Sequence, residues 1–83
     1  MPYIKQMHRP ILDRIVDGMH DASLHVRPGH LNYLLFKFAT ELNPSYENYR
    51  NYIGELNECI AEIRRRLMAK YENEKIKENG DVI

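Results

Sequence analysis

The stretch PSYENYRNYIGELNECIAEIRRRLMAKYENEKIKENG, residues 44–80, decides the fold, because its apolar side chains recur at the spacing of one helix face. They step by four and three residues in turn, which keeps them on a narrow stripe of a helix that turns about 100° per residue. This apolar row consists of Tyr49, Ile53, Leu56, Ile60, Ile63 and Leu67. The spacing therefore predicts one long amphipathic helix.

Residues at both ends of this stretch indicate where the helix starts and stops. Pro44 cannot continue a preceding helix, Ser45 is a favourable N-cap, and Asn48 is a weaker substitute for the Glu or Gln of a capping box. Asn79-Gly80 is a candidate C-cap. Continuing the phase of the apolar row beyond Tyr71 places Glu74 at its centre. We therefore predict a helix over residues 45–73, followed by a polar tail over residues 74–83.

The residues before this helix predict two shorter helices and an arm. Residues 10–22 and 29–43 each carry a helical apolar stripe, the Pro28-Gly29 break separates them, and residues 1–9 form an N-terminal arm. The short link at Asn43-Pro44 implies that the second and third helices are antiparallel neighbours. The predicted fold class is all-α, a small three-helix bundle or helical hairpin with a dominant long C-terminal helix, in a single domain over residues 1–83.

The charge and cysteine content limit the classes of function. Twelve basic and twelve acidic residues cancel, and a chain without basic excess is a poor candidate for nucleic-acid binding. The sequence has no run of about 20 apolar residues, so we expect no membrane span. A single cysteine, Cys59, excludes an internal disulfide, and the start lacks the apolar core of a signal peptide. We therefore expect a cytoplasmic protein.

The length of the third helix predicts a partner. A straight helix from Tyr46 to Asn79 would be about 50 Å long, whereas helices of 12–14 residues cover only about 20 Å of it. Part of the apolar row is then left uncovered, and a second copy of the chain is the simplest cover. We expect a homodimer, and a different protein partner is the other possibility.

Candidate ligand-binding groups have plain structural interpretations. Glu55, Glu58 and Glu62 point away from the apolar row, as an ion-pair ladder on a solvated surface would. Consecutive arginines on a helix spread too widely to grip one anion together. Of the four histidines, two or three could meet at the first connection, but no cysteine or carboxylate spacing supports a metal site there. We therefore predict no catalytic residue, no cofactor and no metal.

Three segments together resemble a known family. MPYIKQ opens the chain, Gly29-His30-Leu31-Asn32-Tyr33 forms a G-x-L-N-Y element, and YENEKIKENGDVI closes the chain. This pattern resembles a family of short microbial and phage proteins, a domain of unknown function, with an MPYI-like start and a Y-E-x-x-K-x-x-x-N-G-D-V tail. The family's E-x-x-R-R helix and tail positions are, in this chain, Glu62, Arg65, Arg66, Tyr71, Glu72, Lys75, Asn79, Gly80, Asp81 and Val82. The resemblance implies no reaction and no substrate.

The resemblance gives the C-terminal tail more weight. We expect the tail to dock, with Asn32 and Tyr33 as receiving groups and with Asp81 as an N-cap or salt-bridge partner. Deleting residues 72–83 would then lower the thermal stability by several degrees.

The function expected from these observations is a non-catalytic helical interaction or regulatory module that self-associates. The alternative is a small nucleotide-binding or nucleotide-processing helical protein. In that alternative Glu55, Glu58 and Glu62 would hold Mg²⁺ at a dimer groove, and Arg65 or Arg66 would bind the phosphate. Only the alternative predicts that Mg²⁺ with nucleotide raises the melting temperature.

Overall fold

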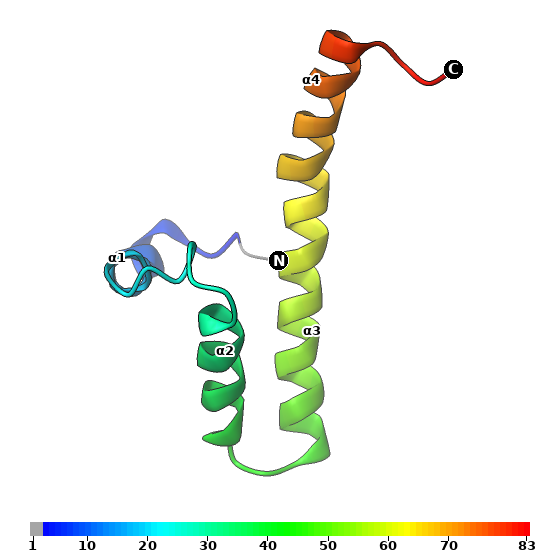
Figure 1. The fold of residues 1–83 in the computed structure, drawn as a ribbon. Coiled ribbons are helices and arrows are strands. Elements are labelled where there is room, and N and C mark those ends of the chain that lie inside the picture. The colour runs from blue at the N-terminus through cyan, green and yellow to red at the C-terminus, as the bar shows by residue number, and fades with distance from the viewer. Residues whose placement is uncertain (1–2) are drawn as a thin grey trace. The chain divides into compact units, whose positions relative to one another are not determined.

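The computed structural model describes residues 3–83, and it is helical with no strand in that range (Figure 1). This confirms the all-α prediction and its long C-terminal helix. Residues 1 and 2 of the predicted arm lie outside the described residues. The chain divides into two units, which we describe separately: an N-terminal unit over residues 3–52 and a C-terminal unit over residues 53–83.

The N-terminal unit begins with a short 3₁₀ turn, η1 (Gln6–His8), that leads directly into helix α1 (Arg9–Asp21). Pro10 lies in the first turn of α1, where its missing N–H leaves no hydrogen bond unmade. The guanidinium of Arg9 donates two hydrogen bonds to the carbonyl oxygen of Ile4, at 3.1 and 2.8 Å. Arg9 therefore ties the arm to the start of α1.

The turn between α1 and helix α2 (His30–Thr40) contains two residues with left-handed backbone. Ser23 has a φ of 58° and Gly29 a φ of 81°. The N–H of Leu24 donates to the carbonyl oxygen of Met19 at 3.1 Å, which closes α1. Gly29 is the residue just before α2, so the predicted break at Pro28-Gly29 is where the second helix starts.

Helix α3 (Tyr46–Glu62) follows α2 after five residues, and Ser45 caps its start. The hydroxyl oxygen of Ser45 accepts a hydrogen bond from the N–H of Asn48 at 3.0 Å, as predicted for an N-cap. The side chain of Asn48 acts differently from a capping-box Glu, because its amide group donates to the carbonyl oxygen of Asn43 at 3.0 Å. Asn48 therefore holds the link itself.

Replacing Ser45 with alanine is expected to lower the free energy of unfolding by about 1 kcal/mol, because one N–H of the first turn of α3 loses its acceptor. In a domain of this size that loss corresponds to a fall of about 4–8 °C in Tm. Ser45→Asp is the control, since a carboxylate at this position still accepts the bond. Equal Tm values for Ser45→Ala and the native chain would show that the cap contributes nothing to stability.

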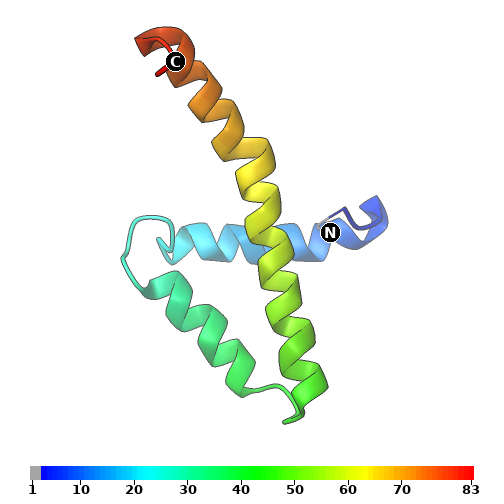
Figure 2. The same cartoon turned by 90° about the vertical axis from the view of Figure 1, so that its right-hand side faces the viewer.

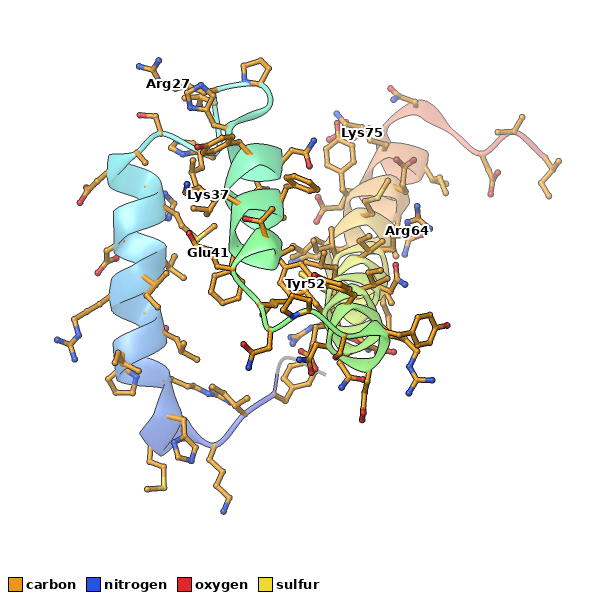
Figure 3. All side chains as sticks on the ribbon, turned by 90° about the horizontal axis from the view of Figure 1, so that it is seen from below. Arg27, Lys37, Glu41, Tyr52, Arg64 and Lys75 are labelled. Carbon is orange, nitrogen blue, oxygen red and sulfur yellow. The ribbon has the colours of Figure 1, made fainter. Side chains whose placement is uncertain are left out.

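Tyr52 packs the start of α3 on α2, and Figure 3 shows its side chain between the two helices. Its hydroxyl donates to the carbonyl oxygen of Leu35 at 2.6 Å, and its ring centroid lies 6.0 Å from that of Phe38. Both contacts join a residue of α2, before the link, to Tyr52 of α3, after it. They hold α2 beside the first turns of α3, within the N-terminal unit.

The C-terminal helix is longer than the predicted 45–73 range. Helix α3 continues through η2 (Ile63–Met68) into helix α4 (Ala69–Asn79), and together they form one helix of 34 residues (Figure 2). Residues 74–79 of the predicted polar tail are therefore helical. The helix ends at the predicted C-cap, because Gly80 has a φ of 85° and its N–H donates to the carbonyl oxygen of Ile76 at 2.8 Å.

Candidate interaction face

The apolar row from Ile53 onward, which lies in the C-terminal unit, is open to solvent. Among residues 3–83 no side chain is buried. In the row, Ile53 is 55% exposed, Ile60 46%, Ile63 44% and Leu67 65%, and only Leu56 is half-buried. Isolated exposed apolar residues are ordinary, but a continuous row along one helix is typical of an interaction surface.

The segment η2 shifts the course of the apolar row. In η2 the backbone is a π-helix, whose N–H groups bond to the carbonyl five residues back, as Ala69 does to Arg64. The wider turn takes up an extra residue, so each later side chain is displaced by about one helical step, roughly 100°. The row consequently continues through Met68 and Tyr71, which are 52% and 57% exposed, rather than through Lys70. This explains why the regular spacing in the sequence fails after Leu67.

Glu62 and Lys75 each take part in a local ion pair of this unit. The Nε and Nη2 atoms of the Arg65 guanidinium each donate a hydrogen bond to a carboxylate oxygen of Glu62, at 2.9 Å. The Glu62 side chain is only 16% exposed. In α4, Lys75 pairs with Glu78 at 3.1 Å, and its ammonium group also lies 5.5 Å from the centre of the Tyr71 ring. The structure thus brings together Glu62 with Arg65, and Tyr71 with Lys75.

The remaining candidate residues lie at separate places along the helices. Asn32 and Tyr33 are exposed in the first turn of α2. Arg66 lies in η2, Glu72 in the first turn of α4, and Asn79 is the last residue of that helix. A functional role for each of these residues remains a prediction.

The last residues of the chain follow the Gly80 cap. The carboxylate of Asp81 accepts hydrogen bonds from the N–H groups of Val82 and Ile83, at 2.6 and 3.4 Å. These bonds are local to the tail. Whether the tail docks stays a prediction.

Because the helix extends to Asn79, the informative deletion is of residues 81–83, which leaves the helix and its Gly80 cap in place. If the tail docks, this deletion is expected to lower Tm by several degrees. Asp81→Asn is the control, since it removes the charge of the tail and retains an acceptor for the local bonds. A melting curve unchanged by the deletion would contradict docking.

The histidines and carboxylates considered as metal ligands can be located in the structure. His20 and His25 meet edge to face, with ring centroids 5.3 Å apart, as the sequence suggested for the first connection. Within residues 3–83 no three His, Cys, Asp or Glu side chains are grouped so that they could hold a metal ion. Glu55, Glu58 and Glu62 therefore do not form such a group within one described chain.

The contacts of Tyr52 and Lys75 are among those that the sequence did not predict. The Tyr52 hydroxyl reaches a backbone carbonyl 17 residues away, and Lys75 lies over the Tyr71 ring. The four-residue spacing of Tyr71 and Lys75 would have indicated the second contact. No sequence signal identifies Leu35 as the acceptor of the first.

No helix in residues 3–83 combines the length and the apolar composition that crossing a membrane requires. The described chain is thus a set of helices with one long amphipathic member, which presents an apolar row beside ion pairs.

Comparison with known proteins identifies the family. The model of the domain of unknown function DUF6899 matches residues 1–82, and the chain belongs to this family. No curated protein and no solved structure matches the chain. The family assignment confirms the resemblance carried by the MPYI-like start, the G-x-L-N-Y element and the tail.

Proposed function

We propose that this protein is a non-catalytic helical interaction module that works as a homodimer, with the second copy covering the apolar row. The observation that carries this proposal is the exposure of the row in a chain with no buried side chain among residues 3–83. Covering apolar surface is favourable by about 25 cal/mol per Å², so an open row favours association. A net charge of zero at pH 7 adds no long-range repulsion between copies.

We also propose that the module acts in the cytoplasm. The single cysteine, Cys59, is exposed and has no partner in the chain with which to form a disulfide. A free exposed thiol suits a reducing compartment.

Molar mass in solution, measured by light scattering over a concentration series, tests the proposal. We expect twice the chain mass of 9.9 kDa at high concentration, and a decrease towards the chain mass on dilution. A mass of one chain at every concentration would overturn the homodimer. A different protein would then have to cover the row.

A further inference from the structure

We propose that the second copy lies antiparallel on the apolar row, so that residues 53–62 of one copy run along residues 63–72 of the other. This inference rests on the homodimer proposed above. It adds the orientation and the register of the pair.

The charge distribution along the C-terminal unit is the first argument. Residues 53–62 contain three carboxylates and no Lys or Arg, for a net charge of −3. Residues 63–72 contain four cations and one carboxylate, for a net charge of +3. Two adjacent segments of ten residues thus carry equal and opposite charge. Only an antiparallel pair places the acidic segment of each copy along the basic segment of the other.

Much of this charge is available for a partner. Within residues 3–83 of the chain, the carboxylates of Glu55 and Glu58 and the cations of Arg64 and Lys70 have no ion-pair partner. All four are exposed.

The apolar row gives the same register independently. As displaced by η2, the row from Ile53 to Tyr71 is symmetric about a point between Ile60 and Ile63. The boundary between the acidic and basic segments, after Glu62, falls at the same point. An antiparallel pair centred there brings apolar side chains together in every layer. The layers are Ile53 with Tyr71, Leu56 with Met68, and Ile60 with Ile63, each repeated by symmetry.

A parallel pair in register has the opposite electrostatics. It would set the consecutive arginines Arg64, Arg65 and Arg66 of both copies at one level, and the carboxylates of both copies at another. Like charges of the two copies at the same level repel each other, and this repulsion disfavours the parallel arrangement.

The charges select the orientation more than they supply the affinity. Glu55 and Glu58 point away from the apolar row, so they act on the partner's cations at a distance and not by direct contact. Salt screens attraction of this kind, with a Debye length of about 10 Å at 0.1 M salt. The preference is therefore expected to be strongest at low salt.

Disulfide trapping between full-length chains tests the orientation. In a Cys59→Ser background, Ile53→Cys and Tyr71→Cys are introduced into separate chains that differ in mass by a tag. The two positions lie about 27 Å apart along one helix, far beyond the Cα separation of about 7 Å that a disulfide allows. After mixing and mild oxidation, we expect the mixed disulfide to dominate and each single-variant preparation to stay largely uncrosslinked. Circular dichroism shows whether each variant keeps its helix content.

The outcomes distinguish this inference from the homodimer itself. Disulfides within each single-variant preparation would show a parallel pair, which overturns the orientation and leaves the homodimer standing. A dimer by light scattering with no disulfide at either position would mean that another face pairs, which also overturns the inference. A monomer at all concentrations would overturn both proposals.

The salt dependence of the dissociation constant gives a second readout that needs no cysteine. Raising the salt concentration from about 0.05 to 0.3 M screens attraction in an antiparallel pair and repulsion in a parallel one. We expect the dissociation constant of the native chain to rise several-fold. A constant value or a fall would contradict the charge argument.

Discussion

Replacing Ile60 with aspartate is expected to raise the dissociation constant of the homodimer by about 100-fold or more, so that the chain is a monomer at micromolar concentrations. The substitution removes about 1.5–3 kcal/mol of favourable apolar burial at the centre of the apolar row. It also introduces a carboxylate that a partner copy would have to desolvate. Since each 1.4 kcal/mol is a factor of ten, the two effects together exceed two orders of magnitude.

Light scattering of Ile60→Asp beside Ala61→Asp makes this test specific. Ala61 is the next residue, it is exposed, and it lies outside the apolar row, so the control adds the same charge at almost the same place. Ala61→Asp is expected to remain a dimer. Because Ile60 is itself 46% exposed in the single chain, neither change should unfold the helix, and circular dichroism checks this. A dimeric Ile60→Asp would place the interface elsewhere.

Replacing Tyr52 with alanine is expected to lower the free energy of unfolding by about 2 kcal/mol, which is less than a fully buried aromatic residue loses on truncation. The change removes the hydrogen bond to the Leu35 carbonyl and the ring contact with Phe38, which join α2 to the start of α3. Thermal melting followed by circular dichroism measures the loss, with a fall of roughly 8–16 °C expected.

Two further tyrosine variants separate the causes. Tyr52→Phe keeps the ring and loses only the hydroxyl, so it is expected to cost about 1 kcal/mol. Tyr46→Ala removes a tyrosine of the same helix that is 82% exposed, and its effect should stay within about 0.5 kcal/mol. Equal losses for Tyr52→Ala and Tyr46→Ala would show that the contact with α2 does not contribute to stability.

Much of the fold could be predicted from the sequence, because local chemistry decides it. The apolar row specifies a long helix, the hydroxyl of Ser45 caps its start, and Gly80 takes the positive φ at its end. The Pro28-Gly29 break and the short link after α2 likewise have local causes. Each of these features depends on residues within a few positions of one another.

Other features could not be predicted from the sequence, because they depend on backbone hydrogen bonding and tertiary packing that the spacing of residues does not determine. In a π-helical turn each backbone N–H bonds to the carbonyl five residues back in place of four. No residue type in η2 predicts this change. The regular phase, continued beyond Tyr71, places Glu74 at the centre of the row, and this predicted a helix end near residue 73. In the structure η2 displaces the later side chains, and the helix continues to Asn79. The hydroxyl of Tyr52 finds its acceptor through tertiary packing, which a pattern of spacings cannot specify.

The candidate site was only partly accessible from the sequence. The importance of the row followed from its spacing, whereas its exposure required the structure. Glu62 and Arg65, three residues apart, are at the spacing of a helical ion pair, and the structure shows their two bonds. The roles of the tail residues remain predictions, because the contacts of Asp81 are with its own neighbours.

The continuity of α3, η2 and α4 also has a consequence for how this helix melts. A peptide of 11 residues, the length of α4, would be marginally helical alone, because the first turn fixes several residues for one hydrogen bond. Joined to α3, α4 needs only propagation. Amide hydrogen exchange should therefore show protection that declines gradually towards Asn79, with no separate transition for α4. The end of the helix frays and reforms without a new nucleation event, and its order depends on the helix that precedes it.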